Sequence, residues 1–209
     1  MLKIYGYNTQ NNKKVLYVAQ ELNIPYKFIT VDLLQRENRT DDFLKMNPTG
    51  KVPVIEHNEN FLFESNAICR YLADISDTPL LPRDNFKKAQ VDQWMEFFTN
   101  HLGKSLNTLY FEKVFKRDHN ISGINQPACL EAEKFCAIQL KILEKELSKR
   151  DFIALDELSI ADLCAYAYIE QMDLLEMSYD SFPNILKWKK KISTRDCIAE
   201  VKKQFNNKI

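Results

Sequence analysis

The chain has 209 residues, of which 29 are basic and 29 are acidic, so its formal net charge at pH 7 is zero. At about 100–200 residues per domain this length allows one large domain or two small ones, and an apolar content of 45% is enough to form a buried core. A nucleic-acid binder, or a protein that binds anionic membranes, is expected to carry an excess of positive charge, and this chain has none. The sequence also shows no apolar leader and no run long enough to cross a bilayer. We therefore expect a cytoplasmic protein that contacts neither nucleic acid nor membrane.

The cysteines and histidines form no recognisable metal-binding or redox motif. No CxxC pair occurs, the number of cysteines is odd, and the histidines are scattered. The apolar helical contexts of several cysteines predict free, reduced and mostly buried thiols. No metal site is expected from residues Cys69, Cys129, Cys136, Cys164, Cys197, His57, His101 and His119.

The first 76 residues alternate between strand-like and helix-like patterns. Apolar residues at helical spacing follow the first short strand, and β-branched and aromatic residues follow that helix. A βαβ unit of this length implies two parallel strands. The predicted elements, in chain order, are a strand over 2–5, a helix from Asn11 to Leu22, a strand over 26–31, a helical turn at 43–44, hairpin strands over 52–56 and 61–63, and a helix over 65–75. This β-α-β-α-β-β-α order is typical of a thioredoxin-like domain.

A proline-containing linker over residues 77–83 separates this half from an all-α half. Apolar residues at helical spacing predict helices over 86–115, 127–147 and 159–177, and a last helical region that begins at Pro183. Ser159 and Asp162 have the spacing of a capping box at the start of the third of these helices. The sequence therefore predicts an α/β thioredoxin-like domain over residues 1–76 and an all-helical domain over residues 84–209.

Pro53 lies inside a predicted strand, where its missing amide hydrogen is unexpected. A cis peptide bond before it would turn the N–H and C=O groups of Val52 outward, ready to pair with an extended peptide. An ordinary trans proline at a strand edge would give the same sequence. The residues alone leave both interpretations open.

The segment Glu64-Ser65 stands where a predicted strand meets a predicted helix. Ser65 is a suitable N-cap, and capping alone would account for it. A helix N-terminus also binds carboxylates through free N–H groups and its positive dipole end, and Glu64 would attract an ammonium group. Together the two residues could therefore recognise an α-amino-acid group.

The polar turn over residues 7–12 follows the first strand. It could simply cap the next helix, with Asn11 or Asn12 as the cap. It could also supply hydroxyl and amide donors to an anionic sulfur or oxygen atom. Because the turn has no cysteine, a thioredoxin-type CxxC mechanism is excluded.

Three motifs together carry a family resemblance over nearly the whole chain: Asn-Pro-Thr-Gly-Lys-Val-Pro at 47–53, Phe-Glu-Ser-Asn-Ala-Ile at 63–68, and Ser-Ile-Ala-Asp at 159–162. In order and spacing they resemble the cytosolic glutathione S-transferase superfamily, with similarity to the phi, theta and nu-like bacterial classes. The resemblance implies glutathione as co-substrate, no metal, a homodimer, and activation of the glutathione thiol as a thiolate that attacks a small hydrophobic electrophile.

The resemblance also assigns roles to particular residues. Thr9 and Asn11 would contact the sulfur, although threonine replaces the more common serine and Tyr5 or Tyr7 could make a tyrosine-type contact. Tyr7, Tyr110, Phe111 and Phe115 could form an apolar substrate wall between the domains, or belong to the core. The residues expected to bind glutathione are Arg39, Lys51, Val52, Pro53, Glu64 and Ser65.

Other activities remain compatible with this resemblance. Some nu-class and related bacterial enzymes reduce disulfides with glutathione, and peroxide reduction or isomerisation would use the same scaffold. A non-catalytic protein-interaction module is a further alternative, because the fold alone does not establish activity.

Overall fold

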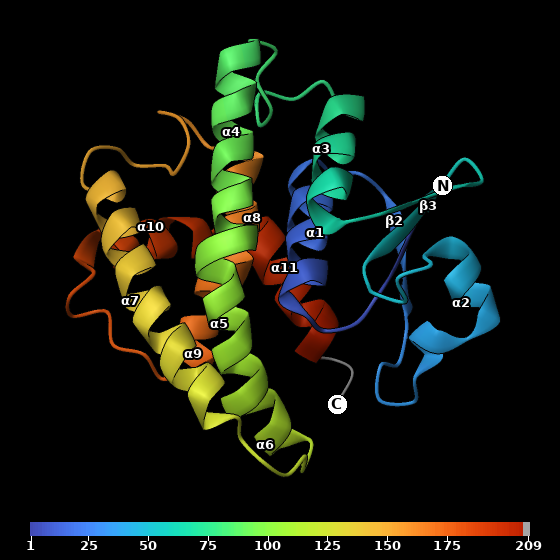
Figure 1. Ribbon diagram of the computed structural model, residues 1–209. Coiled ribbons are helices and arrows are strands. Elements are labelled where there is room, and N and C mark those ends of the chain that lie inside the picture. Colours follow the sequence, from blue (N-terminus) through green and yellow to red (C-terminus); the bar gives the residue numbers. More distant parts are fainter. Residues whose placement is uncertain (207–209) are drawn as a thin grey trace. The chain divides into compact units, whose positions relative to one another are not determined.

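The computed structural model describes residues 1–206, the side chain of Asn206 excepted. It divides into two compact units, and each is described by itself (Figure 1). The first unit comprises Met1–Leu81 and the segment that begins at Arg195, and the second comprises Pro82–Thr194. Helix α11 (Asp196–Asn206) thus belongs to the first unit, whereas the sequence pattern grouped it with the helical half. The domain limits 1–76 and 84–209 remain predictions.

A four-stranded mixed sheet in the order β2-β1-β3-β4 is the centre of the first unit. Strand β1 pairs with β2 in parallel and with β3 in antiparallel orientation, and β3 pairs with β4 in antiparallel orientation. The parallel β1–β2 pair confirms the predicted βαβ unit. The strands are β1 (Leu2–Gly6), β2 (Tyr26–Thr30), β3 (Val54–His57) and β4 (Asn60–Phe63).

The predicted hairpin between β3 and β4 is confirmed, and its turn has two residues where the sequence pattern left four, 57–60, between the strands. Asn58 and Glu59 both have positive φ, at 50° and 65°, which is the backbone of the type I′ turns that match strand twist. Strand β3 begins two residues later than expected, because Pro53 has no amide hydrogen to donate to a neighbouring strand.

Helices surround this sheet. In Figure 1, α1 (Gln10–Glu21) and α3 (Ser65–Ile75) lie on one side of it and α2 (Asp41–Met46) on the other. A short 3₁₀ turn, Glu37–Arg39, precedes α2. On the α2 side, Phe43 packs with buried side chains from the sheet and its loops, Val31 and Val54. Helix α11 packs against α1, where Arg195 forms an ion pair with Glu21.

The second unit is helical throughout its described elements. A long continuous helix occupies the predicted span 86–115 and contains two wider, π-helical turns, Phe98–Leu102 and Phe111–Phe115. Each wide turn closes with a bond between residues five apart, from Gly103 N–H to Phe98 O and from Lys116 N–H to Phe111 O. The helices are α4 (Asn85–Phe97), α5 (Gly103–Tyr110), α6 (Lys116–Asp118), α7 (Gln126–Leu147), α8 (Ile160–Ile169), α9 (Gln171–Leu174) and α10 (Pro183–Ser193).

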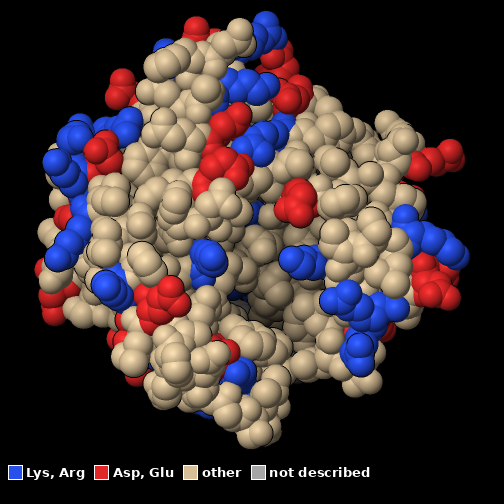
Figure 2. Space-filling view, in the orientation of Figure 1, with Lys and Arg blue, Asp and Glu red and all other residues tan. Residues whose placement is uncertain are grey.

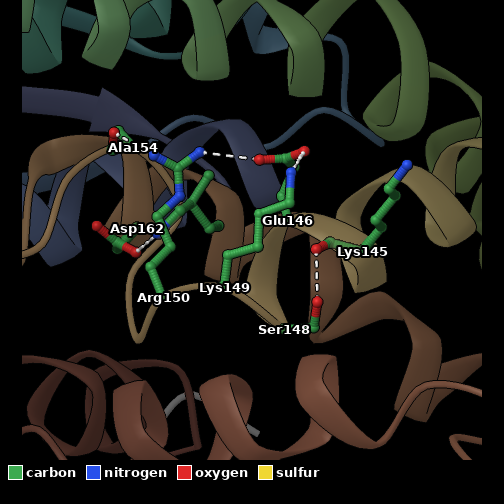
Figure 3. A network of polar contacts seen from close by, with 8 residues as sticks. Lys145, Glu146, Ser148, Lys149, Arg150, Ala154 and Asp162 are labelled. Carbon is green, nitrogen blue, oxygen red and sulfur yellow. Dashed lines mark hydrogen bonds and ion pairs between the residues drawn. The ribbon is translucent and has the colours of Figure 1, made fainter.

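The predicted capping box at Ser159 and Asp162 is confirmed, and it extends into a buried network. Asp162 is fully buried, and its carboxylate accepts hydrogen bonds from the backbone N–H groups of Ile153 (2.8 Å) and Ser159 (3.0 Å), from the Ser159 hydroxyl (3.0 Å) and from Trp188 Nε1 (2.9 Å). Arg150, shown in Figure 3, makes further hydrogen bonds within the connection between α7 and α8. Its guanidinium donates to Ala154 O at 3.0 Å and to Glu146 Oε2 at 3.3 Å, so the connection from α7 to α8 is fixed by side chains at both ends.

Surface charge and buried thiols agree with the composition. Basic and acidic side chains are interspersed over the face in Figure 2, and all five cysteines are buried thiols that form no disulfide. Within residues 1–206, no group of three or more His, Cys, Asp or Glu side chains is arranged to hold a metal ion. No helix described there is both long and apolar enough to span a membrane.

Candidate functional site

The start of α1 presents the hydroxyl of Thr9. Thr9 is the N-cap of this helix, and its Oγ1 accepts a hydrogen bond from Asn12 N at 3.4 Å. The expectation that Asn11 or Asn12 would be the cap is therefore wrong, because Thr9 is the residue with extended backbone directly before the first helical turn. A hydroxyl that accepts one hydrogen bond can still donate its proton. Thr9 can thus cap α1 and donate to a ligand at the same time.

Asn12 keeps this turn close to the sheet. Its side chain is fully buried, and its Oδ1 accepts from Tyr7 N at 3.3 Å. A Cβ atom at Gly6 would lie 1.9 Å from Asn12 Nδ2, so only glycine leaves room for this side chain. The turn after β1 is therefore held by the hydrogen bond from Tyr7 N to Asn12, for which Gly6 leaves room.

The two tyrosines that offered an alternative sulfur contact have different environments. Tyr5 donates its hydroxyl to Glu56 Oε2 at 2.7 Å, and burial together with this carboxylate raises the pKa of Tyr5 to about 12. Its phenol is therefore already used within the sheet. Burial and the nearby charge of Asp32 raise the pKa of Tyr7, so that phenol also stays protonated at neutral pH.

The start of α3 is built differently from the predicted cap. Ser65 is the first helical residue, and Glu64 stands in the N-cap position with φ 71° and no side-chain hydrogen bond to the helix. The interpretation of Ser65 as N-cap is thus wrong, because its hydroxyl donates to Asn11 Oδ1 at 3.4 Å instead. A non-glycine residue with positive φ is uncommon, and such residues are concentrated at functional sites. The bond from Ser65 to Asn11 joins two residues that the sequence analysis assigned to different parts of one site.

A third part of the site is the loop that ends in Pro53. Asn47 is buried and organises this loop: its Oδ1 accepts from Thr49 N at 3.0 Å, and its Nδ2 donates to Lys51 O at 2.7 Å. Gly50 adopts φ 62°, and a Cβ atom there would lie 2.5 Å from Arg39 Nη1. Arg39 itself donates to Thr49 O at 3.3 Å. The loop therefore places the exposed cationic side chain of Arg39 beside the segment that leads into Lys51, which is exposed as well.

Val52 and Pro53 connect this loop to β3. The peptide bond between them is cis, which decides between the two interpretations that the sequence left open. The Val52 side chain is partly buried and packs against the cluster of Val31, Phe43 and Val54. Pro53 is buried as well.

The four candidate substrate-wall aromatics are divided between the units. Tyr7 belongs to the first unit, and Tyr110, Phe111 and Phe115 belong to the second. Phe111 and Phe115 stack with ring centroids 5.5 Å apart, and Phe115 stacks on His119 at 4.1 Å. Phe111 is 47% exposed, so it is a surface residue and not a core residue.

Sequence reasoning did not predict the structural roles that three residues have in this region, namely Asn12, Asn47 and Asn66. Asn66 accepts a buried hydrogen bond from Lys14 Nζ at 2.7 Å. The position of Asn47 before Pro48 is a turn signal that could have been used. The roles of Asn12 and Asn66 depend on contacts with Gly6 and Lys14 that no local pattern reveals.

Comparisons with known proteins agree with this geometry. A family model described as "Glutathione S-transferase, N-terminal domain" matches residues 1–74, and one described as "Glutathione S-transferase, C-terminal domain" matches residues 106–196. Glutathione S-transferase F14 of Arabidopsis thaliana is 32% identical over 195 residues, which cover 88% of this chain and 76% of that protein.

Solved structures show the same relationship. Glutathione transferase F2 from Populus trichocarpa superposes with a TM-score of 0.91 at 28% identity and covers 99% of this chain and 100% of its own. A structure of glutathione S-transferase-I bound with lactoylglutathione superposes with a TM-score of 0.87 at 25% identity and covers 96% of this chain and 97% of its own. The thioredoxin-like sheet, the helical second unit and these matches establish that the chain belongs to the cytosolic glutathione S-transferase superfamily.

Proposed function

We propose that the chain is a glutathione S-transferase that binds glutathione on its first unit and activates the thiol for attack on a small hydrophobic electrophile. The observation that carries the proposal is the hydrogen bond between Ser65 and Asn11. It holds the N-terminal end of α3, suited to a carboxylate, against the N-terminal end of α1, suited to a thiolate. Both helix ends present free N–H groups and a positive dipole.

In the proposed complex each part of the site meets one part of the tripeptide. Glu64 and Ser65 bind the ammonium and carboxylate groups of the γ-glutamyl residue. The backbone of Val52, fixed before Pro53, pairs with the cysteinyl residue. Arg39 and Lys51 attract the glycyl carboxylate.

The sulfur then lies near Thr9 and Asn11. A free thiol has a pKa of about 8.5, so only a small fraction is thiolate at neutral pH. Lowering that pKa by about two units requires roughly 2.7 kcal/mol of preferential stabilisation of the anion. Hydrogen bonds to a charged group contribute about 1.5–3 kcal/mol each, so the Thr9 hydroxyl and the Asn11 amide are together sufficient.

The thiolate attacks an electrophilic carbon, forms a C–S bond and displaces the leaving group. The stacked rings of Phe111 and Phe115, with Tyr110, are the proposed apolar surface for that electrophile on the second unit. The family resemblance proposes Tyr7 as a substrate contact on the first unit. By its family we further propose that the chain is cytoplasmic and forms a homodimer. Light scattering on the purified chain would test the dimer.

Retention on a glutathione matrix with elution by free glutathione tests the binding. A panel at fixed glutathione concentration then tests the reaction, with a chloronitroaromatic, a mixed disulfide and an organic peroxide as substrates. We expect conjugation of the chloronitroaromatic. Turnover of only the disulfide or the peroxide would support a reductase, and failure to bind glutathione would support a non-catalytic interaction module.

A further inference from the structure

A buried lysine on α1 has no part in the function proposed above. Lys14 is only 1% exposed, and its Nζ donates to Asn66 Oδ1 at 2.7 Å inside the first unit. Lysine is almost never fully buried unless its ammonium group is paired, because removing that charge from water is costly. A lysine at this position therefore needs a specific explanation.

Its partner lies in the first turn of α3. Asn66 directly follows Ser65, and the N-cap Glu64 makes no side-chain hydrogen bond to the helix. A helix start without a side-chain cap is free to shift or fray unless other contacts hold it. Here two hydrogen bonds to α1 hold it, from Ser65 to Asn11 and from Lys14 to Asn66.

These two bonds run side by side. Asn11 and Lys14 are three residues apart on α1, and such residues share one face with about 5–6 Å between their Cβ atoms. On α3 their partners, Ser65 and Asn66, are consecutive. The pair of bonds therefore fixes the start of α3 relative to the start of α1 in rotation as well as in position.

We propose that Lys14 is a positioning residue of the glutathione site, which holds Ser65 where it can bind the γ-glutamyl carboxylate. The proposal rests on the proposed function, because it assumes that the start of α3 receives this carboxylate. The ammonium group also adds positive charge beneath a helix end whose dipole already favours an anion.

The test measures glutathione KM and kcat, and the Kd of S-methylglutathione by calorimetry. S-methylglutathione has no thiol, so its affinity reports on the peptide contacts alone. We expect Lys14→Met and Asn66→Ala to raise both KM and Kd about five- to tenfold, as for loss of one hydrogen bond to a charged group, with kcat largely retained. Lys14→Arg should restore binding to within about twofold, because it keeps the charge and a donor.

Lys27→Met is the matched control, because this lysine is exposed on β2. It should leave KM and Kd unchanged. If Lys14 served only stability, the variants would melt earlier while the folded fraction kept wild-type KM and Kd, and that result would overturn the proposal. If Lys14→Met does not fold, Asn66→Ala decides by the same measurements.

The affinity of the wild-type protein for S-methylglutathione shows whether a negative result concerns Lys14 or the proposed function. Wild-type affinity for S-methylglutathione together with unchanged affinity in the folded variants would overturn the role of Lys14 alone. Absence of wild-type affinity would overturn the proposed function and this role with it.

Discussion

Replacing Thr9 by alanine tests the proposed activation of the thiol most directly. Thr9 has two roles in the structure: its Oγ1 caps α1 through Asn12 N, and its hydroxyl proton is available to a ligand. Thr9→Ala removes both. Loss of an N-cap costs about 1 kcal/mol of stability, and loss of a hydrogen bond to a thiolate costs about 1.5–3 kcal/mol.

The second loss translates into a shift of the thiol pKa. At 1.36 kcal/mol per pKa unit, the pKa of bound glutathione should rise by about one to two units. Starting from the proposed bound pKa of about 6.5, the thiolate fraction at pH 7, and with it kcat for conjugation, should fall about threefold to twenty-fivefold. The KM for glutathione should change little, because the γ-glutamyl and glycyl contacts remain.

A pH–rate profile separates this effect from loss of the cap. Thr9→Ala should regain activity as the pH rises, whereas destabilisation alone would scale the whole profile down without shifting it. Thr9→Ser keeps the cap and the donor and should follow the wild-type profile. An unshifted profile for folded Thr9→Ala, at wild-type kcat, would refute Thr9 as the group that stabilises the thiolate.

Three further predictions concern other contacts. Ser65→Ala should weaken glutathione binding about tenfold, as expected for a lost hydrogen bond to a carboxylate, and calorimetry that finds wild-type affinity would remove Ser65 from the site. Asp162→Ala should lower the free energy of unfolding by about 3–5 kcal/mol in urea titrations, because three buried N–H donors lose their acceptor; a loss below about 1 kcal/mol would contradict this account. Burial raises the pKa of Glu21, but the hydrogen bonds with Arg195 and Cys197 and the charge of Arg195 together outweigh it and hold that pKa below its ordinary value. The ion pair therefore stabilises the fold above the ordinary glutamate pKa of about 4.3, and this stabilisation is lost as the pH falls through the lower pKa of the folded protein. Glu21→Gln should abolish that part of the acid dependence of the unfolding free energy. A pH–stability curve identical to that of the wild type would show that the pair contributes nothing.

Much of the fold could be predicted from the sequence because its signals are local. The apolar spacing of α3, the hairpin between residues 52 and 63 and the Ser159–Asp162 capping box each depend on residues a few positions apart, and the structure confirms all three. The wide turns of the long helix escaped prediction, since their backbone angles remain helical and their residues fit an α-helix equally well. The placement of α11 escaped it too, because that depends on the distant contact between Glu21 and Arg195.

The candidate site was predictable in its residue types and less so in its construction. Ser65 and Thr9 were singled out correctly as polar residues at helix starts, but their capping roles were misassigned. Which of two neighbouring residues caps a helix depends on backbone conformation, here the positive φ of Glu64, and the side chains alone do not encode it. The bond from Ser65 to Asn11 spans 54 positions, beyond the range of any local pattern.

The two wide turns between α4 and α6 have a consequence for the evolution of this surface. A π-helical turn accommodates one more residue than an α-helical turn while the helix on either side continues. Deleting one residue within Phe98–Leu102 or Phe111–Phe115 can therefore be absorbed by reversion to ordinary α-helix. The same deletion elsewhere in the rod would rotate every later side chain by about 100°. These turns are thus the places where the helix can gain or lose one residue while the side chains that follow keep their direction and its backbone hydrogen bonds are not interrupted.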